Sequence, residues 1–374
     1  MNAANDTVVY NDVTASNNTT HHYYYYSEDY DYEQYNDHIF QIFDFEIPIY
    51  GYIWPILVLF TSLCNILVIA GFLRRRMRNP TNALLVSIAI SDSLTGLVTL
   101  PATFHIYAGR NMFLTEDWCN VSMITRLYIA RAFHTVSVWQ TLVLGIHRYL
   151  QVRHPALAQR HCTMKRTLVS VGVIYVLAFV LHMYHAFDIK AVNGFCHWEV
   201  EEPCGWTCVY IWCTLLSMHV LPCAILTVLA ILMIKTVRVI NSNNMAESAR
   251  RKSKKSRNVT IVVILVVVIF LIPELPYGIF YLSIVSLRHS KKALLPLETN
   301  RIFHCIYEIL LVVSFHLNFW VYCILVRKFR SCIKALLRLV ICDHVSFQRL
   351  EAETTTSSSK GVELEKIETE MESE

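Results

Sequence analysis

The sequence predicts an all-α membrane protein, a seven-transmembrane helix bundle followed by a short amphipathic eighth helix. Of its 374 residues, 54% are hydrophobic and only 17% are charged, which is too apolar for an ordinary soluble domain. The apolar residues gather in blocks, and seven blocks reach the roughly 20 residues that span a hydrocarbon core. Because a backbone in lipid must satisfy its own hydrogen bonds, each block is expected to be a helix. The predicted spans are Tyr50–Leu73, Thr81–His105, Val121–Leu150, Leu168–Phe187, Trp206–Ile234, Val259–Leu287 and Ile302–Val326.

The basic residues orient this bundle. Lys and Arg follow the first, third, fifth and seventh spans, as in Arg74–Arg78 and Arg250–Arg257, whereas the loops on the other side carry few of them. The positive-inside rule therefore places the N-terminus outside the cell and the C-terminus in the cytoplasm, as for a multi-pass protein of the plasma membrane. Residues 1–49 contain no apolar core of a cleavable signal peptide, so the first span is expected to act as the signal anchor.

The segment before the first span, residues 1–49, is expected to be a disordered extracellular tail. It is acidic and rich in tyrosine, with few branched apolar residues. Asn5, Asn17 and Asn18 begin glycosylation motifs, which suits an outside location. The tail is either a plain solvated leader or a means of concentrating a cationic ligand.

After the transmembrane domain of residues 50–326, residues 327–342 are predicted to form an amphipathic helix on the membrane surface, with its basic side chains at the lipid head groups. Cys332 and Cys342 in this helix are either palmitoylation sites or unmodified thiols. Residues 343–374 are expected to be a disordered cytoplasmic tail with a run of phosphorylatable Ser and Thr.

Four of the twelve cysteines fall outside the cell, where disulfides persist: Cys119, Cys196, Cys204 and Cys208. They allow three pairings. A Cys119–Cys196 bridge would pin the loop between the fourth and fifth spans over the mouth of the bundle, and Cys204–Cys208 could close a second, small ring. A zinc site built from Cys196, His197, Cys204 and Cys208 is the alternative.

Charged and polar residues inside the spans are expensive and point to function. Asp92 lies in the second span at a depth similar to that of Ser137, Ser314 and Asn318. One carboxylate with hydroxyl and amide oxygens suits a small hard cation, so a sodium ion is one interpretation. A hydrogen-bonded polar core without an ion is the other. No other cofactor is expected.

A second polar group is predicted nearer the outside. Its members are Arg131, His134, Glu274, His304 and Glu308. Arg131 and Glu308 either pair with each other or separately bind the polar end of a ligand. A retained internal salt bridge is the structural alternative.

The triplet His147-Arg148-Tyr149 ends the third span at the cytoplasmic side. Arg148 is either a contact residue for a cytoplasmic partner or an interfacial anchor. An acid before the arginine would hold it in a resting ion pair, but here histidine stands at that position. No Asp or Glu occurs between Ala249 and Leu271 to substitute, so we expect packing to hold the resting state and some basal activity to remain.

These residues together resemble the rhodopsin-like, or class A, G protein-coupled receptors. The likeness covers residues 48–342 and rests on residues in the family's order and spans: Asn65, Asp92, Cys119, Arg148-Tyr149, Pro222, Phe270, Pro276, Asn318 and Tyr322. Within the family the chain is similar to the invertebrate neuropeptide receptors near the sex-peptide and myoinhibitory-peptide receptor and the myosuppressin or FMRFamide-like receptors. The stretches that carry this are Met77-Arg78-Asn79-Pro80-Thr81-Asn82-Ala83, Phe133-His134-Thr135, Cys196-His197-Trp198-Glu199 and Glu274-Leu275-Pro276.

The chain departs from the wider family at several positions. Glu274 stands where a tryptophan is usual, and Phe319 replaces the proline of the Asn-Pro-x-x-Tyr motif. The interval from Cys119 to Arg148 is also a few residues longer than usual. Most of these departures are similar in the neuropeptide subgroup.

The resemblance implies a receptor for an amidated neuropeptide of the myoinhibitory or FMRFamide type, which activates a heterotrimeric G protein of the inhibitory Gi/o class. Arg148, Tyr149, Pro276, Asn318 and Tyr322 would then serve activation and G-protein coupling. A receptor kinase and arrestin are the expected partners of the C-terminal tail, and nucleic acid is not an expected partner. The alternative is a small-solute or proton-coupled transporter that uses Asp92, Glu274 and Glu308, although the chain has no internal repeat of the kind found in many transporters. No nucleophile or metal motif predicts an enzyme.

Overall fold

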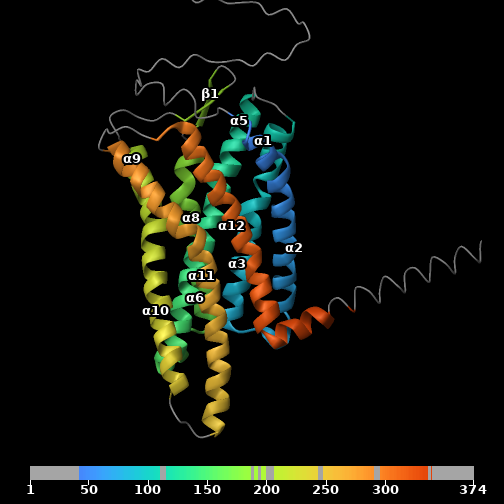
Figure 1. Cartoon of the computed structure of the whole chain (residues 1–374), viewed down its shortest axis with the longest axis vertical. Coiled ribbons are helices and arrows are strands. Elements are labelled where there is room, and N and C mark those ends of the chain that lie inside the picture. The colour runs from blue at the N-terminus through green and yellow to red at the C-terminus, as the bar shows by residue number, and fades with distance from the viewer. Residues whose placement is uncertain are drawn as a thin grey trace, which may run out of the picture. The chain divides into compact units, whose positions relative to one another are not determined.

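The computed structural model describes residues 42–109, 115–186, 189–192, 195–198, 206–242, 247–289, 295–335 and 338. They lie in the unit Ile39–Glu374, and their helices form the predicted all-α bundle (Figure 1). The first three spans are α1 (Glu46–Pro48), η2 (Ile49–Ile53) and α2 (Trp54–Phe72); α3 (Pro80–Leu97), α4 (Leu100–Thr103) and η4 (Phe104–Ala108); and α5 (Glu116–Met123), η5 (Ile124–Ala130) and α6 (Arg131–Arg153). The other four are α8 (Met164–His182) with η6 (Met183–Ala186); α9 (Trp206–Thr214), η7 (Leu215–Val220) and α10 (Leu221–Ser242); α11 (Glu247–His289); and α12 (Leu297–Leu325). The short 3-10 helix η3 (Arg75–Met77) connects the first and second spans, and the short helix α7 (Pro155–His161) connects the third and fourth. The loop between the fourth and fifth spans contains strands β1 (Ile189–Val192) and β2 (Phe195–Trp198).

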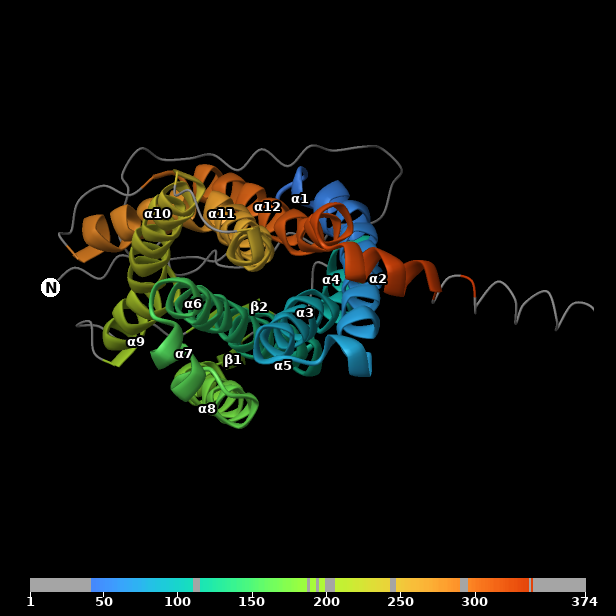
Figure 2. The ribbon, with the colours of Figure 1, turned by 90° about the horizontal axis from the view of Figure 1, so that it is seen from below.

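Six helices in the described part of the chain are long and apolar enough to cross a membrane. The third predicted span, the continuous run α5–η5–α6, is not among them because it carries Arg126, Arg131 and several uncharged polar side chains. These residues are tolerated because α6 packs against α3, α8, α10 and α11, so its side chains face other helices instead of lipid. Figure 2 shows α6 between α11 and α8.

The helices share burial unequally. In the second span (Pro80–Ala108), 61% of the most apolar stretch is buried inside the bundle, whereas the corresponding share in α8 is 11%. The α8 helix therefore lies at the edge of the bundle (Figure 2). Side chains such as Val176 and Leu177 are exposed there, on the surface that would face lipid. Because lipid is as apolar as these side chains, their exposure carries no solvation penalty.

The first span begins earlier than the sequence predicts. Helical structure starts at Glu46 instead of Tyr50, and the Glu46 side chain is fully buried. Its carboxylate accepts the backbone N–H of Phe43 at 3.1 Å and forms an ion pair with Arg301 on α12 at 2.8 Å. Residues 42–49 thus belong to the bundle and not to the expected tail. Residues 1–41, with Asn5, Asn17 and Asn18, lie outside the described residues.

Local sequence signals set several helix ends. Asn79 caps α3 by accepting the backbone N–H of Asn82 at 2.9 Å, with Pro80 at the first helical position. Thr163 caps α8 in the same manner through the N–H of Arg166. By contrast α11 runs through both Pro273 and Pro276, each of which removes one helical hydrogen bond.

The outer halves of four spans contain π-helical turns. They are η2, η4, η5 and η7 in the first, second, third and fifth spans. A π turn closes its hydrogen bond one residue later than an α turn, so it holds more residues and rotates the helix beyond it. The seven residues of η5 lie between Cys119 and Arg148 and take up part of the extra length noted there.

Strands β1 and β2 form an antiparallel hairpin in which Ala191 faces Cys196, and both strands contact α5. Cys119 on α5 and Cys208 on α9 each take part in a disulfide bond. The side chain of Cys196 and all of Cys204 lie outside the described residues, so the Cys119–Cys196 pairing stays a prediction. It agrees with the contact between α5 and β2.

The eighth helix is present over residues 327–335. Phe329 and Ile333 are buried against the bundle, whereas Arg327 and Lys328 are exposed, which is the amphipathic pattern that the sequence predicts. Arg330 donates hydrogen bonds to the carbonyl oxygens of Cys323 and Ile324 at the end of α12, and so satisfies that helix end. Cys332 is a half-buried free thiol; Cys342 and the tail of residues 343–374 lie outside the described residues.

Candidate functional site

Glu308 on α12 is the centre of a charged cluster in the outer part of the bundle. Its Oε2 atom accepts a hydrogen bond from the Tyr50 hydroxyl at 2.5 Å, and its Oε1 atom lies 3.3 Å from Nε2 of His304. The guanidinium of Arg126 lies 5.5 Å from the centre of the Tyr50 ring and interacts electrostatically with Glu308. Of the two alternatives for Arg131 and Glu308, the direct pair is not formed, because His304, Tyr50 and Arg126 surround the carboxylate instead.

Arg126 was missed by the sequence reasoning. It lies within the predicted third span, so the rule that flagged Arg131 applies to it equally. The two arginines are five residues apart, with Arg126 inside η5 and Arg131 at the first position of α6. Arg126 points to the first, second and seventh spans, where Tyr50, Tyr107 and Glu308 are found.

Arg131 has different surroundings. Its side chain is half-buried and donates a hydrogen bond to the hydroxyl of Tyr210 on α9. Tyr277 and Tyr281 of α11 are its other close neighbours. Among the described residues, none supplies a carboxylate at ion-pair distance from Arg131.

A buried hydrogen-bond network surrounds Glu274 in the middle of the bundle. Glu274 has no exposed surface. Its carboxylate lies 3.1 Å from Nε2 of His134 on α6 and 2.9 Å from Nδ1 of His219 on η7, and it accepts the hydroxyl of Tyr307 on α12 at 3.1 Å. The network thus joins four of the spans. Because protein groups saturate this carboxylate and both side chains are buried, Glu274 and His134 offer no open surface to a ligand.

The sequence reasoning named Glu274 and His134 but missed His219 and Tyr307. His219 stands three residues before Pro222, as Glu274 stands two before Pro276. A polar residue close to a helix-breaking proline inside a span is the signal that could have found both. Tyr307 offered no such signal, since tyrosines are frequent throughout the chain.

One tyrosine connects the Glu308 cluster with the Glu274 network. Tyr277 stacks on Tyr307 with 3.8 Å between ring centres and an interplanar angle of 10°, and its hydroxyl lies 3.1 Å from Nδ1 of His304. A change at His304 or Glu308 therefore reaches Glu274 through direct side-chain contacts.

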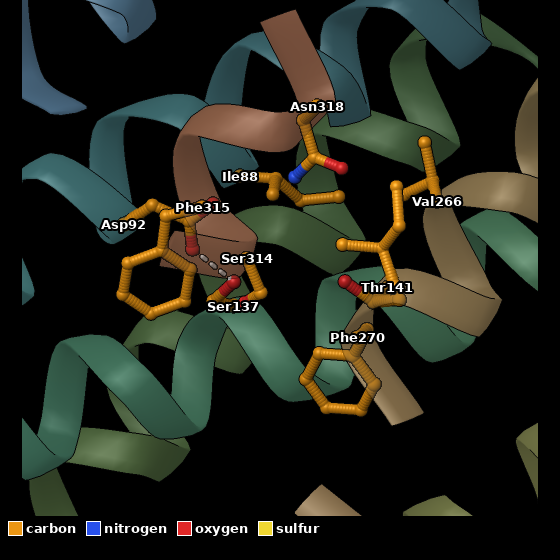
Figure 3. A pocket seen from close by; sticks show the side chains of 10 residues that line it. Ile88, Asp92, Ser137, Thr141, Val266, Phe270, Ser314, Phe315 and Asn318 are labelled. Atoms are coloured by element: carbon orange, nitrogen blue, oxygen red, sulfur yellow. Dashed lines mark hydrogen bonds between the residues drawn. The ribbon is translucent and has the colours of Figure 1, made fainter. Parts of the chain in front are cut away.

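The residues expected around Asp92 do come together. Asp92, Ser137, Ser314 and Asn318 line one cavity of about 10 Å³ between α3, α6, α11 and α12 (Figure 3). Ser137 donates its hydroxyl to Oδ1 of Asp92 at 2.5 Å, whereas Oδ1 of Asn318 is buried and has no hydrogen-bond partner among the described residues. The cavity is thus small and partly polar, and not all of its polar atoms are hydrogen-bonded.

At the end of the bundle that the sequence assigns to the cytoplasm, Arg148 is buried. Its Nε atom donates to Oγ1 of Thr260 on α11 at 3.1 Å, and its Nη1 atom donates to Oε1 of Gln151 at 2.7 Å. The expectation that packing alone restrains Arg148 is therefore wrong, because a hydroxyl on the sixth span accepts the hydrogen bond in place of a carboxylate. His147 and Tyr149 are half-buried beside it.

Tyr322, another of the residues expected to serve activation and coupling, is enclosed by aromatic rings. The ring of Phe72 lies 5.2 Å from it and that of Phe329 lies 5.9 Å away. Phe319, at the position where the family has proline, packs 6.1 Å from Phe329. The departure from the Asn-Pro-x-x-Tyr motif thus adds a ring to the contact between α12 and the eighth helix.

Comparison with known proteins gives a consistent result. The family model described as 7 transmembrane receptor (rhodopsin family) matches residues 64–322. The chain is similar to the sex peptide receptor of Drosophila melanogaster, with 31% identity over 50% of this chain and 47% of that receptor. It is also similar to sex peptide receptor-related protein 2 of Caenorhabditis elegans, with 31% identity over 50% of this chain and 41% of the relative, and to the galanin-like G-protein coupled receptor npr-9 of that organism, with 31% identity over 33% and 28%. The matched part of the chain spans less than half the length of these curated relatives.

Proposed function

Since the chain belongs to the rhodopsin family of seven-transmembrane receptors, we propose that it is a G protein-coupled receptor for an amidated neuropeptide at the plasma membrane, with its N-terminus outside. The observation that carries the peptide ligand is the outer group of half-buried polar and charged side chains, Arg126, Arg131, His304 and Glu308. A peptide has many polar backbone groups and charged side chains, and it needs such partners when it leaves water. The names of two similar relatives, the sex peptide receptor and sex peptide receptor-related protein 2, support a peptide ligand.

The proposed mechanism is a shift between two states of the bundle. The resting state has Arg148 bound to Thr260, so the cytoplasmic ends of α6 and α11 are joined. Peptide binding at the outer cluster would act through Tyr277 and the Glu274 network on α11, and its cytoplasmic end would swing outward. The peptide must bind the active state more tightly than the resting state for this shift to occur. The exposed Arg148 and Tyr322 would then contact a heterotrimeric G protein of the Gi/o class, and a receptor kinase and arrestin would act on the C-terminal tail.

The transporter alternative finds little support. Asp92, Glu274 and Glu308 are each held by separate partners, namely Ser137, two histidines, and Tyr50 with His304. No described chain of hydrogen bonds links Asp92 to the other two carboxylates. The family match is moreover to receptors.

A screen of amidated peptides tests the proposed function. Cells that carry the receptor and a promiscuous G protein should give a dose-dependent response to at least one peptide of the myoinhibitory or FMRFamide type. Surface expression, measured on the same cells with an N-terminal tag, is the control. Absence of any response from well-expressed receptor would remove the neuropeptide proposal.

Restraint of Arg148 by Thr260 predicts the behaviour of two variants. Thr260→Val removes the acceptor but keeps the shape, so basal G-protein signalling should rise several-fold, since one buried hydrogen bond to a charged group is worth about 1.5–3 kcal/mol. Thr260→Ser keeps the hydroxyl and should stay near wild type. His147→Asp places an acid beside Arg148 and should lower basal signalling. Equal basal activity in the valine and serine variants would contradict this role of Thr260.

The Asp92 cavity fits the sodium ion that the sequence suggests, and we include it in the proposal. Asp92, Ser137, Ser314 and Asn318 would hold the ion, and the unsatisfied Oδ1 of Asn318 supplies a free oxygen. The ion would neutralise the buried carboxylate. Because a ligand stabilises the state that binds it, sodium chloride should raise the melting temperature of the peptide-free receptor relative to choline chloride. Asp92→Asn should abolish that difference; an equal sodium effect in the variant would exclude this site.

A further inference from the structure

The arginines in the outer part of the bundle differ in whether a carboxylate neutralises their charge. Arg301 forms an ion pair with Glu46 at 2.8 Å, and Arg126 interacts with Glu308. Arg131 has no such carboxylate among the described residues. A guanidinium inside a membrane protein normally pairs with an acid or a set of carbonyl groups, whereas the described residues around Arg131 offer its positive charge no carboxylate.

The neighbours of Arg131 would suit an anion. Three tyrosines interact electrostatically with it, Tyr210 on α9 and Tyr277 and Tyr281 on α11. Two of them are also bound elsewhere, since the Tyr210 hydroxyl lies 2.9 Å from Nδ1 of His182 and that of Tyr277 lies 3.1 Å from Nδ1 of His304. Phenolic hydroxyl groups can donate to an anion as well as accept from arginine. The cation is thus surrounded by groups that can complete the coordination of a carboxylate.

We propose that Arg131 is the anion-binding subsite of the peptide pocket and that the ligand places a carboxylate on it. This inference rests on the proposed function and specifies the ligand that the receptor selects. Arginine binds a carboxylate through two parallel hydrogen bonds, whereas a neutral amide would accept a hydrogen bond and leave the charge unbalanced. Because the proposed ligand is amidated at its C-terminus, the carboxylate comes from an acidic side chain of the peptide.

The position of this subsite also couples it to the signalling network. Arg131 lies three residues before His134 on the third span, which is roughly 4.5 Å along an α-helix. Tyr277 is a neighbour of Arg131 and stacks on Tyr307, which donates to Glu274. A carboxylate on Arg131 would therefore contact the tyrosines of α9 and α11 and act on the buried network from above.

A charge-matched peptide screen tests the subsite. Each peptide is made with its acidic side chains as Asp or Glu or as the corresponding Asn or Gln, and with its C-terminus as an amide or an acid, in every combination. Potency is measured on wild type, Arg131→Gln, Arg131→Lys and, as a matched control, Arg126→Gln. Wild type should lose roughly 10- to 100-fold in potency when the recognised carboxylate becomes an amide, as expected for a charged hydrogen bond.

In Arg131→Gln the same change of the peptide should have almost no effect, because the partner of the carboxylate is gone. Arg131→Lys should retain part of the difference, and Arg126→Gln should weaken both forms of the peptide to a similar extent. This pattern separates a direct contact from a structural role, which would lower the potency of both forms. An effect that follows the C-terminus instead of a side chain would mean that the ligand is not amidated, which would contradict that part of the proposed function.

Two results would overturn the inference. An equal loss in wild type and Arg131→Gln would show that another residue binds the carboxylate, and full potency of peptides without any carboxylate would show that none is needed. In both cases the receptor still responds to peptide, so the proposed function stands. If no form of any peptide activates well-expressed wild type, the proposed function fails and this inference fails with it.

Discussion

Replacing Glu274 by glutamine should strongly destabilise the receptor and abolish its response to peptide. The change removes a fully buried charge that binds His134, His219 and Tyr307. Removing one partner from a buried ionic network costs about 3–5 kcal/mol, and here it also disconnects α11 from three other spans. The measurements are the melting temperature of the purified receptor and peptide-stimulated signalling at matched surface expression.

Glu298→Gln is the matched control for this variant. Glu298 lies in the first turn of α12 and is exposed, so the same chemical change there should leave both quantities near wild type. A Glu274→Gln receptor that melts and signals as the control does would mean that the network neither supports the fold nor transmits the signal.

Gly71→Ala should destabilise the receptor, although alanine is the better helix former. A Cβ atom at Gly71 would lie 2.5 Å from Cε2 of Phe329, and Phe329 is fully buried between Phe72 and Tyr322. The ring must move, which shifts the eighth helix and the packing around Tyr322. Overpacking of this kind costs about 1–3 kcal/mol, so we expect a lower melting temperature and weaker G-protein coupling.

Gly172→Ala on α8 provides a control of opposite sign. Nothing lies within 4 Å of a Cβ atom at Gly172, so only the helix preference for alanine remains, worth about 0.5–1 kcal/mol in favour of the variant. Melting temperatures that change in the same direction for both variants would contradict the close contact between Gly71 and Phe329.

The number of spans could be predicted from the sequence, but not their ends. A block of apolar residues marks the part of a helix that lies in lipid. The helix itself continues into water wherever caps and propensity permit, as α11 does from Glu247 to the expected start at Val259. At Glu46 the helix begins before the apolar block. The burial of this acid depends on its ion pair with Arg301, which is distant in the sequence, so it could not be predicted from local residues.

Most residues of the candidate site could be predicted from the sequence, but not which of them contact each other. The rule that charges inside spans are functional selected Arg131, His304 and Glu308. Which residues face each other depends on helix rotation, and the π turns η5 and η7 alter that rotation without a hydropathy signal. For this reason Glu308 meets Arg126 and not Arg131. The acceptor for Arg148 was missed because the search was for an acid, whereas a threonine hydroxyl fulfils the role.

The most direct test of the central claim is nucleotide exchange by purified receptor in lipid vesicles with a Gi heterotrimer. A peptide that is active in the cell screen should accelerate GTP binding in wild type. Arg148→Ala should bind the same peptide without accelerating exchange, because the contact residue for the G protein is missing. Peptide-dependent uptake of solute or protons by these vesicles, without any acceleration of nucleotide exchange, would contradict the receptor account and favour the transporter.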